Sequence, residues 1–231
     1  MKVLAVDTSS VVATCAVLDK EKIIGEYSLN QDLSHSEKLS PMIKELMDSL
    51  KLKIQDIDIF ATAIGPGSFT GLRIGIATMN SYAHVANRPV IGISTLEALA
   101  FNLPNNDIVI PMMDARRDRV YTGIYKWIGG ELFNIIEPTI MKVTELTDFI
   151  NDNYEKVTVN GDGTLKYKDI LENKLEEKIL FAPRGFNNCR ATSVGELAIL
   201  KYNKGEIDNY FTLAPEYLRE SQAQREFNKR Q

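Results

Sequence analysis

A glycine-rich stretch at residues 64–76, with the sequence IGPGSFTGLRIGI, constrains the fold more than any other part of the chain. Gly65 and Gly67 flank Pro66, and this combination needs backbone angles that a regular strand does not use. It therefore ends the apolar run at residues 57–63, which has the composition of a buried strand. The stretch predicts the end of a strand, a tight turn and the start of a helix.

The predicted helix carries an unusual set of glycines. Ser68 or Thr70 is suited to cap its first turn, and the helix reaches Asn87. The glycines recur at every fourth position and share one face: Gly67, Gly71 and Gly75. An apolar face lies beside them, formed by Leu72, Ile76, Met79 and Ala83. Each glycine inside a helix costs about 1 kcal/mol relative to alanine, so we expect another backbone to approach this face closely.

A phosphate and a helix of another chain are the two neighbours to compare for such a face. A phosphate is disfavoured, because the stretch lacks the Gly-Lys-Ser/Thr of phosphate-binding loops and its glycine spacing differs from that of dinucleotide-binding motifs. A helix of another chain fits better, since a face without side chains lets two backbones pack closely. The simpler alternative is that the glycines only pack the helix against its own sheet. We favour the partner helix, which predicts that Gly71→Leu prevents association and leaves the fold intact.

Composition and charge restrict the class of protein. The chain has 231 residues, of which 44% are hydrophobic, enough for a buried core in one large or two small domains. A net charge of −4 has the wrong sign for a protein that binds nucleic acid by itself. No run approaches the roughly 20 apolar residues of a membrane helix and no signal-peptide pattern is present, so we expect a cytoplasmic protein. Cys15 and Cys189 are solitary, which predicts reduced, inert thiols.

The order of predicted elements repeats along the chain. The first half has strands at 2–6, 11–18 and 23–29, a helix opened by Ser34, the strand 57–63, the glycine-rich helix, a strand at 89–93 and a helix capped by Ser94. The second half has strands at 108–113 and 120–127, a helix at 143–150, a strand at 157–160 and a helix opened by Ser193. Both halves begin with a strand that runs into a polar turn, at Asp7 and at Asp114. We expect an α/β fold of two related units, at 1–104 and 105–218, with a polar tail at 219–231.

Several motifs resemble those of the TsaB family, also called YeaZ, within the superfamily of actin-like ATPases and sugar kinases. They are VDTS at 6–9, HSEKLSP at 35–41, GPGSFTGLRIG at 65–75, DARR at 114–117, GDG at 161–163 and PEYLR at 215–219. The likeness spans nearly the whole chain, and the glycine-rich motif is its most specific part. The resemblance implies the actin-like fold, built of duplicated βββαβα units with a degenerate second half.

The resemblance also implies a function. Proteins of this family are needed to make threonylcarbamoyl-adenosine beside the anticodon of tRNA, and they have no catalytic activity of their own. The implied partners are the catalytic paralogue TsaD, the ATPase TsaE and a second copy of the chain, with tRNA met only through the complex. The family's contact face is built on the glycine-motif helix and the helix before it. The residues expected there are His35, Leu39, Met42, Ile43, Leu46, Gly67, Phe69, Thr70, Gly71, Leu72, Gly75, Ile76 and Met79.

A nucleotide site of the superfamily type would lie between two hairpin turns. Its expected remnants here are Asp7, Thr8, Ser9, Asp114, Arg116, Arg117, Gly161, Asp162 and Gly163. The second turn has Ala115-Arg116-Arg117 where glycines would let the backbone approach a phosphate, so we expect the usual ATP pose to be blocked. The two arginines either meet a phosphate or carboxylate of a partner or belong to a solvated turn. We expect no cofactor on the isolated chain, and ATP only at the interface with TsaD.

The sequence does not predict a catalytic or metal site. TsaD-like enzymes carry two metal-binding histidines four residues apart, whereas Leu39 follows His35 at that spacing and the other histidine is His84. Aspartates at strand ends are more often caps of the backbone than metal ligands. Two other functions stay open: an independent ATP-dependent kinase or hydrolase that uses Asp7, and a binder of a sugar or nucleotide without catalysis.

Overall fold

The computed structural model describes residues 1–30, 35–104 and 107–219 of the chain. Its first half consists of β1 (Lys2–Asp7), β2 (Val12–Asp19), β3 (Ile23–Asn30), α1 (His35–Ser49), β4 (Ile59–Gly65), α2 (Phe69–Ala86), β5 (Val90–Ser94) and α3 (Thr95–Phe101). Ser68 is the cap of α2, since its hydroxyl oxygen accepts a hydrogen bond from the amide of Gly71. Asn87 ends α2 in the left-handed conformation. Ser34, which was expected to open α1, lies outside the described residues.

The second half adds a longer series of elements. They are β6 (Ile108–Asp114), β7 (Arg119–Ile128), β8 (Glu131–Lys142), α4 (Val143–Asn153), β9 (Val157–Asn160), α5 (Asp162–Lys166), α6 (Lys168–Leu175), β10 (Ile179–Phe181) and α7 (Ala191–Asn203). Sequence patterns did not indicate α5, α6 or β10, because such short elements give too little periodicity to detect.

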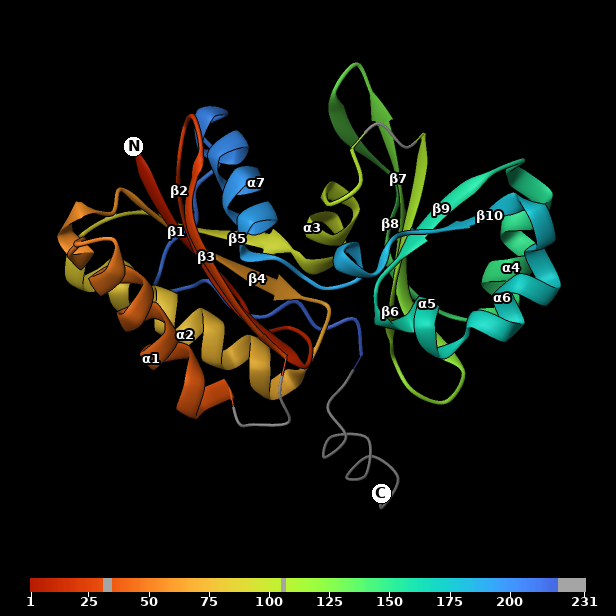
Figure 1. Cartoon of the computed structure of the whole chain (residues 1–231), viewed down its shortest axis with the longest axis horizontal. Coiled ribbons are helices and arrows are strands. Elements are labelled where there is room, and N and C mark those ends of the chain that lie inside the picture. Colours follow the sequence, from red (N-terminus) through yellow and green to blue (C-terminus); the bar gives the residue numbers. More distant parts are fainter. Residues whose placement is uncertain (31–34, 105–106, 220–231) are drawn as a thin grey trace.

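The strands form two five-stranded sheets, with the orders β3-β2-β1-β4-β5 and β10-β9-β6-β7-β8. Counted from its opposite edge, the second sheet has the order β8-β7-β6-β9-β10, which matches the first sheet strand by strand. In each half, neighbouring strands among the first three run antiparallel, whereas the fourth and fifth strands run parallel to the first strand. The predicted duplication is confirmed, and Figure 1 shows the two sheets facing each other across α3 and α7.

Helices cover both faces of the first sheet, as a sheet with buried parallel strands requires. On the outer face α1 and α2 lie beside each other and pack on β1 and β2 through an apolar core that includes Leu4, Val6, Leu39, Ile43, Leu46 and Met79. On the inner face α7 packs on the same sheet through Ala191, Val194, Leu197 and Ala198. All seven residues of β4 are buried between these layers.

The position of α7 corrects two predictions. Residues 191–203 come from the second half of the chain but belong to the core of the first sheet, so the predicted units at 1–104 and 105–218 need correction at their end. Arg190 anchors the start of α7 to β3 through an ion pair with Glu26 at 2.5 Å. Ser193 does not open this helix, which begins at Ala191; its hydroxyl instead donates to the side-chain oxygen of Asn102 at 2.6 Å.

The chain then returns along the first sheet in a C-terminal segment, residues 206–219. The amide of Asp208 donates to the carbonyl of Val90, and the amide of Glu216 donates to the carbonyl of Ile64 at 2.8 Å. The segment reaches the second half where the Arg219 guanidinium donates to the carbonyl of Ala115 at 2.8 Å. This segment therefore contacts both halves. Within the part of the chain that the structure describes, no helix is both long and apolar enough to cross a membrane.

Candidate functional site

The glycine face, formed by Gly67 just before α2 and by Gly71 and Gly75 within it, lies against the turn that follows β1. A Cβ atom on Gly71 would overlap the carbonyl oxygen of Thr8, and one on Gly75 would lie 2.6 Å from the Thr8 hydroxyl. That hydroxyl donates to the carbonyl of Gly71 at 2.7 Å, while the amide of Ser68 donates to the carbonyl of Ser9 at 2.7 Å. The prediction that this face receives a partner's helix is wrong. The simpler alternative holds, since the glycines pack α2 against the chain's own backbone.

Most side chains predicted at the partner interface are interior. Leu39, Met42, Ile43, Leu46, Leu72, Ile76 and Met79 are all buried within the chain. The imidazole Nε2 of His35 lies 2.8 Å from the carbonyl oxygen of Ser10 and so holds the start of α1 on the β1–β2 turn. The ring of Phe69 stacks on that of Tyr217, with centroids 3.9 Å apart. Thr70 is exposed. Whether α1 and α2 bind a partner stays a prediction, but these buried side chains would not make the contact.

A different face of α2 reaches the surface. It is formed by Thr70, Ile74, Ala77, Ser81 and Val85, whose spacing places them on one side of the helix. Val85 is 70% exposed, Thr70, Ala77 and Ser81 are exposed, and Ile74 is half-buried. We call these five residues the outer face of α2. Because three of them are small, another helix can approach it closely.

Asp7 is fully buried at the end of β1. Its Oδ1 accepts hydrogen bonds from the Ser9 amide at 2.8 Å and the Ser9 hydroxyl at 2.7 Å, whereas its Oδ2 has no partner among the described residues. Burial raises the pKa of Asp7 to about 6, and the Ser9 hydrogen bonds only partly oppose this. Cys189 lies 3.6 Å from the Ser9 oxygen, and its own burial, together with the charges of Asp7 and Asp162, raises the pKa of the thiol. The charges of Asp7 and Asp162, from the two halves of the chain, therefore both act on Cys189.

The corresponding aspartate of the second half has a different environment. Asp114 accepts hydrogen bonds from Lys166 at 2.6 Å, from the Arg116 amide at 2.9 Å and from the Tyr167 hydroxyl at 3.0 Å. Although partial burial acts to raise the pKa of Asp114, these bonds hold it below its usual value. The amide of Asp114 in turn donates to Asp162 at 3.1 Å.

The turn after β6 has an uncommon backbone. Arg116, Arg117 and Asp118 have φ angles of 62°, 54° and 54°, a left-handed conformation that glycine adopts most readily. All three side chains are exposed. The turn therefore keeps the backbone shape of a glycine-rich loop while bearing bulky side chains.

That the usual ATP pose is blocked at these two turns stays a prediction. The hydroxyls of Thr8 and Ser9 already donate to groups of the chain itself, to Gly71 and Asp7. In the second turn, the side chains of Arg116 and Arg117 are long and exposed. No group of three or more His, Cys, Asp or Glu side chains within the described ranges is arranged to hold a metal ion.

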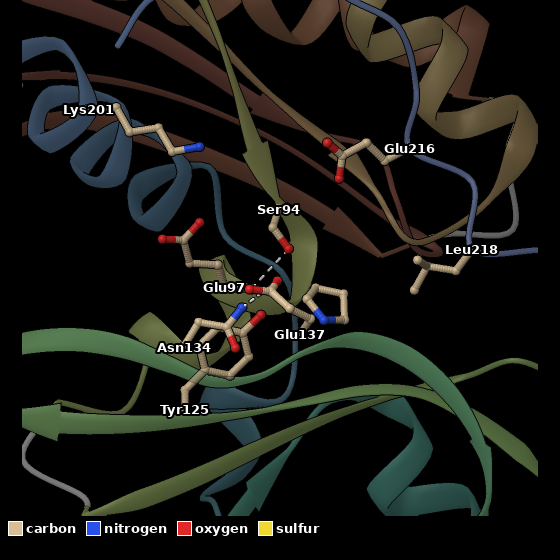
Figure 2. A pocket seen from close by; sticks show the side chains of 9 residues that line it. Ser94, Glu97, Tyr125, Asn134, Glu137, Lys201, Glu216 and Leu218 are labelled. Carbon is tan, nitrogen blue, oxygen red and sulfur yellow. Dashed lines mark hydrogen bonds between the residues drawn. The ribbon is translucent and has the colours of Figure 1, made fainter. Parts of the chain in front are cut away.

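A cavity of about 430 Å³ lies elsewhere, between α3, the β7–β8 hairpin, α7 and the C-terminal segment (Figure 2). Its polar lining consists of Ser94, Glu97, Tyr125, Asn134, Glu137, Lys201 and Glu216. Sequence reasoning singled out only Ser94 and Glu97 among them, as a helix cap. No local motif signals this site, because four separate segments contribute to it.

Comparison with known proteins agrees with this architecture. The matching family model describes TsaD, tRNA N6-adenosine threonylcarbamoyltransferase, and covers residues 22–227. The tRNA threonylcarbamoyladenosine biosynthesis protein TsaB of Bacillus subtilis is 31% identical over 97% of this chain and 96% of its own length. The chain belongs to the TsaB family. Members of this family are named for the biosynthesis of tRNA threonylcarbamoyladenosine.

Solved structures agree with the family and the fold. A Pseudomonas aeruginosa protein described as similar to the peptidase YeaZ matches with a TM-score of 0.81 and 25% identity, covering 94% of this chain and 99% of that one. A ROK hexokinase from Thermus thermophilus matches with a TM-score of 0.50 at 10% identity, covering 87% of this chain and 100% of its own. The TsaB-family chain therefore has the predicted fold of the actin-like ATPases and sugar kinases.

Proposed function

We propose that this TsaB-family chain is a non-catalytic subunit in tRNA threonylcarbamoyladenosine synthesis. It supports the transferase TsaD by binding it through the surface of α1 and α2. The same surface joins two copies when the chain is alone. TsaE joins the complex, and tRNA and ATP are met only there.

The outer face of α2 carries this proposal. Ala77 lies at its centre and is exposed, with the exposed Thr70 and Ser81 on either side. Val85 extends the face with an apolar side chain that is 70% exposed. A helix with small residues and an exposed apolar end matches the ridge-and-groove packing of helices between chains. This face replaces the glycine face as the surface on which a partner would pack.

The interior of the first turn supports the absence of catalysis by the isolated chain. The hydroxyls of Thr8 and Ser9, which match the superfamily's phosphate loop, are engaged within the chain. His35 is held on the Ser10 carbonyl, and no second histidine lies four residues after it. The groups of this turn thus serve to hold α1, α2 and β1 together.

One substitution tests the proposed contact. Ala77→Arg places a long charged side chain on the outer face without disturbing the core. It should weaken association with TsaD and with a second copy at least about tenfold, because a buried unpaired charge at an interface is strongly unfavourable. Light scattering with and without TsaD measures assembly, and tRNA modification with TsaD and TsaE measures function.

The matched control is Ile170→Arg on α6, another partly exposed helix position. It should change neither assembly nor modification. Normal assembly and activation by a folded Ala77→Arg protein would contradict the proposal.

An independent ATP-dependent kinase or hydrolase is the rival function. One observation favours it, since Oδ2 of the buried Asp7 lacks a partner among the described residues. Steady ATP turnover by the isolated chain, lost in Asp7→Ala, would support the rival. The scaffold proposal expects no turnover from either protein.

A further inference from the structure

The cavity of about 430 Å³ has an unusual balance of charge. Each of three walls brings one glutamate: Glu97 from α3, Glu137 from β8 and Glu216 from the C-terminal segment. Lys201 from α7 is the single cationic side chain among the lining residues. Figure 2 shows these groups arranged around a common space. The lining therefore has two negative charges in excess.

Among the described residues, no ion pair neutralises these three glutamates. The Lys201 ammonium donates to the carbonyl of Gly92 at 3.2 Å, and no ion pair within the described ranges joins it to any of the three glutamates. Glu137 accepts one hydrogen bond, from the amide of Asn134 at 2.9 Å. Burial raises the pKa of Glu97, and the more distant charge of Lys201 only partly opposes this. Glu97 is half-buried, whereas Glu137 and Glu216 are exposed. A carboxylate that is partly removed from water is stabilised by a cation that reaches it.

A second observation, independent of the acidic groups, points to a ligand. Tyr125 is only 1% exposed and lines the cavity, and its hydroxyl has no hydrogen-bond partner among the described residues. Burial, together with the charges of Glu97 and Glu137, raises the pKa of this phenol, and the nearby Ser94 side chain, which makes no hydrogen bond of normal geometry to it, only partly opposes this. A buried hydroxyl without a partner is unfavourable, and such groups are normally satisfied by water or by a ligand.

We propose that this cavity binds a small aliphatic diamine. Each ammonium group has three donors and no acceptor, which matches a lining of carboxylates and a phenol oxygen that can accept. Two ammonium groups would neutralise the excess charge, one between Glu97 and Tyr125 and the other towards Glu137 and Glu216. A neutral polyol of the same length would leave the carboxylates uncompensated. The amine site is separate from the outer face of α2 and does not depend on the proposed scaffold function.

Calorimetric titration of the full chain tests the proposal with a matched pair of probes. The first probe is 1,4-diaminobutane, and the second is 1,4-butanediol, which has the same carbon chain but no charge. At neutral pH and low salt the diamine should bind with a stoichiometry of one, and the diol should not bind. Addition of salt should weaken binding, since the attraction is electrostatic.

Three variants locate the site. Glu97→Gln keeps the shape of the side chain and should weaken diamine binding at least about tenfold, because it removes a half-buried charge that the ligand pairs with. Tyr125→Phe should weaken binding a few-fold, the loss expected for one hydrogen bond. Glu137→Gln lies on an exposed part of β8 and provides a second charge deletion that does not disturb the core.

The control is Glu131→Gln, at the exposed start of the same strand, which should leave affinity unchanged. Circular dichroism checks that each variant is folded. Absence of diamine binding, equal binding of the diol, or an equal loss in Glu131→Gln and Glu97→Gln would overturn the proposal.

Discussion

The turn after β1 and the turn after β6 occupy equivalent places in two sheets with the same strand order, yet their environments differ. In the first half, Asp7, Thr8 and Ser9 are buried beneath α1 and α2. In the second half, Arg116 and Arg117 are exposed. Duplicated topology has therefore been kept while the surroundings of the two turns have diverged.

One packing device is common to both halves. The helix after the first parallel strand begins against the end of the half's first strand, and glycine makes the approach possible. In the first half Gly71 meets the carbonyl of Thr8, and in the second half Gly163 would place a Cβ 2.9 Å from the carbonyl oxygen of Met112. Backbone packing is therefore retained where two elements must touch, whereas the turns themselves are free to change.

The largest expected effect concerns this approach. Gly71→Ala should lower the free energy of unfolding by at least about 3 kcal/mol, because the new methyl group overlaps a backbone carbonyl that has little room to move. Gly163→Ala should have a smaller effect, since its clearance is greater. Urea unfolding of both variants measures the difference.

Gly185→Ala is the matched control, because a Cβ there meets open space. It should change the free energy of unfolding by less than about 1 kcal/mol. If Gly71→Ala were no more destabilising than this control, the packing account of the glycine face would be wrong. The earlier expectation that Gly71→Leu leaves the fold intact is reversed for the same reason.

A second comparison uses pH, since the two aspartates should act in opposite directions. The pKa of Asp7 is raised to about 6, so between about pH 4 and 6 the folded state holds a proton that the unfolded state has lost. Stability should therefore fall as pH rises through this range, by roughly 2–3 kcal/mol from Asp7. The pKa of Asp114 is lowered, so its contribution is present at neutral pH and is lost as pH falls.

Urea unfolding at several pH values measures both slopes. Asp7→Asn should remove the decline in the free energy of unfolding between pH 4 and 6. Asp114→Asn should lower the free energy of unfolding more at pH 7 than at pH 4. An unchanged slope in Asp7→Asn would show that the buried carboxyl is not the titrating group.

Substitutions within the two turns should change stability least. Arg117 has a φ of 54°, so Arg117→Gly should raise the free energy of unfolding by about 0.5–1 kcal/mol through relief of left-handed strain. Val11, in the first turn, has no positive φ, so Val11→Gly should lower the free energy of unfolding by a similar amount. Thermal unfolding of the two variants should shift the midpoint in opposite directions, and shifts of the same sign would contradict this.

Local patterns were sufficient for much of the fold. The apolar runs gave the strands of both halves, and the cap at Ser68 followed from residue type and position. The repeated strand and aspartate turn at Asp7 and Asp114 predicted the duplication that the two sheets confirm. Such features depend on neighbouring residues, which is why one sequence is enough to read them.

Contacts between distant segments could not be predicted from these local patterns. The glycines of α2 predicted a close neighbour, but only the fold identified this neighbour as Thr8, about sixty residues earlier in the chain. Likewise, nothing near Ala191 indicates that α7 packs on the first sheet. The cavity around Tyr125 combines side chains from four segments, and no spacing links them.

The family, the duplicated strand order and the need for a close backbone approach at Gly71 could all be predicted before the fold was known, because each is encoded in consecutive residues. The neighbour of Gly71, the exposed face of α2 and the place of the acidic cavity became known only from the folded chain. The physical reason is that periodicity reports which side of an element is apolar or small, whereas the partner on that side is selected by the packing of the whole chain.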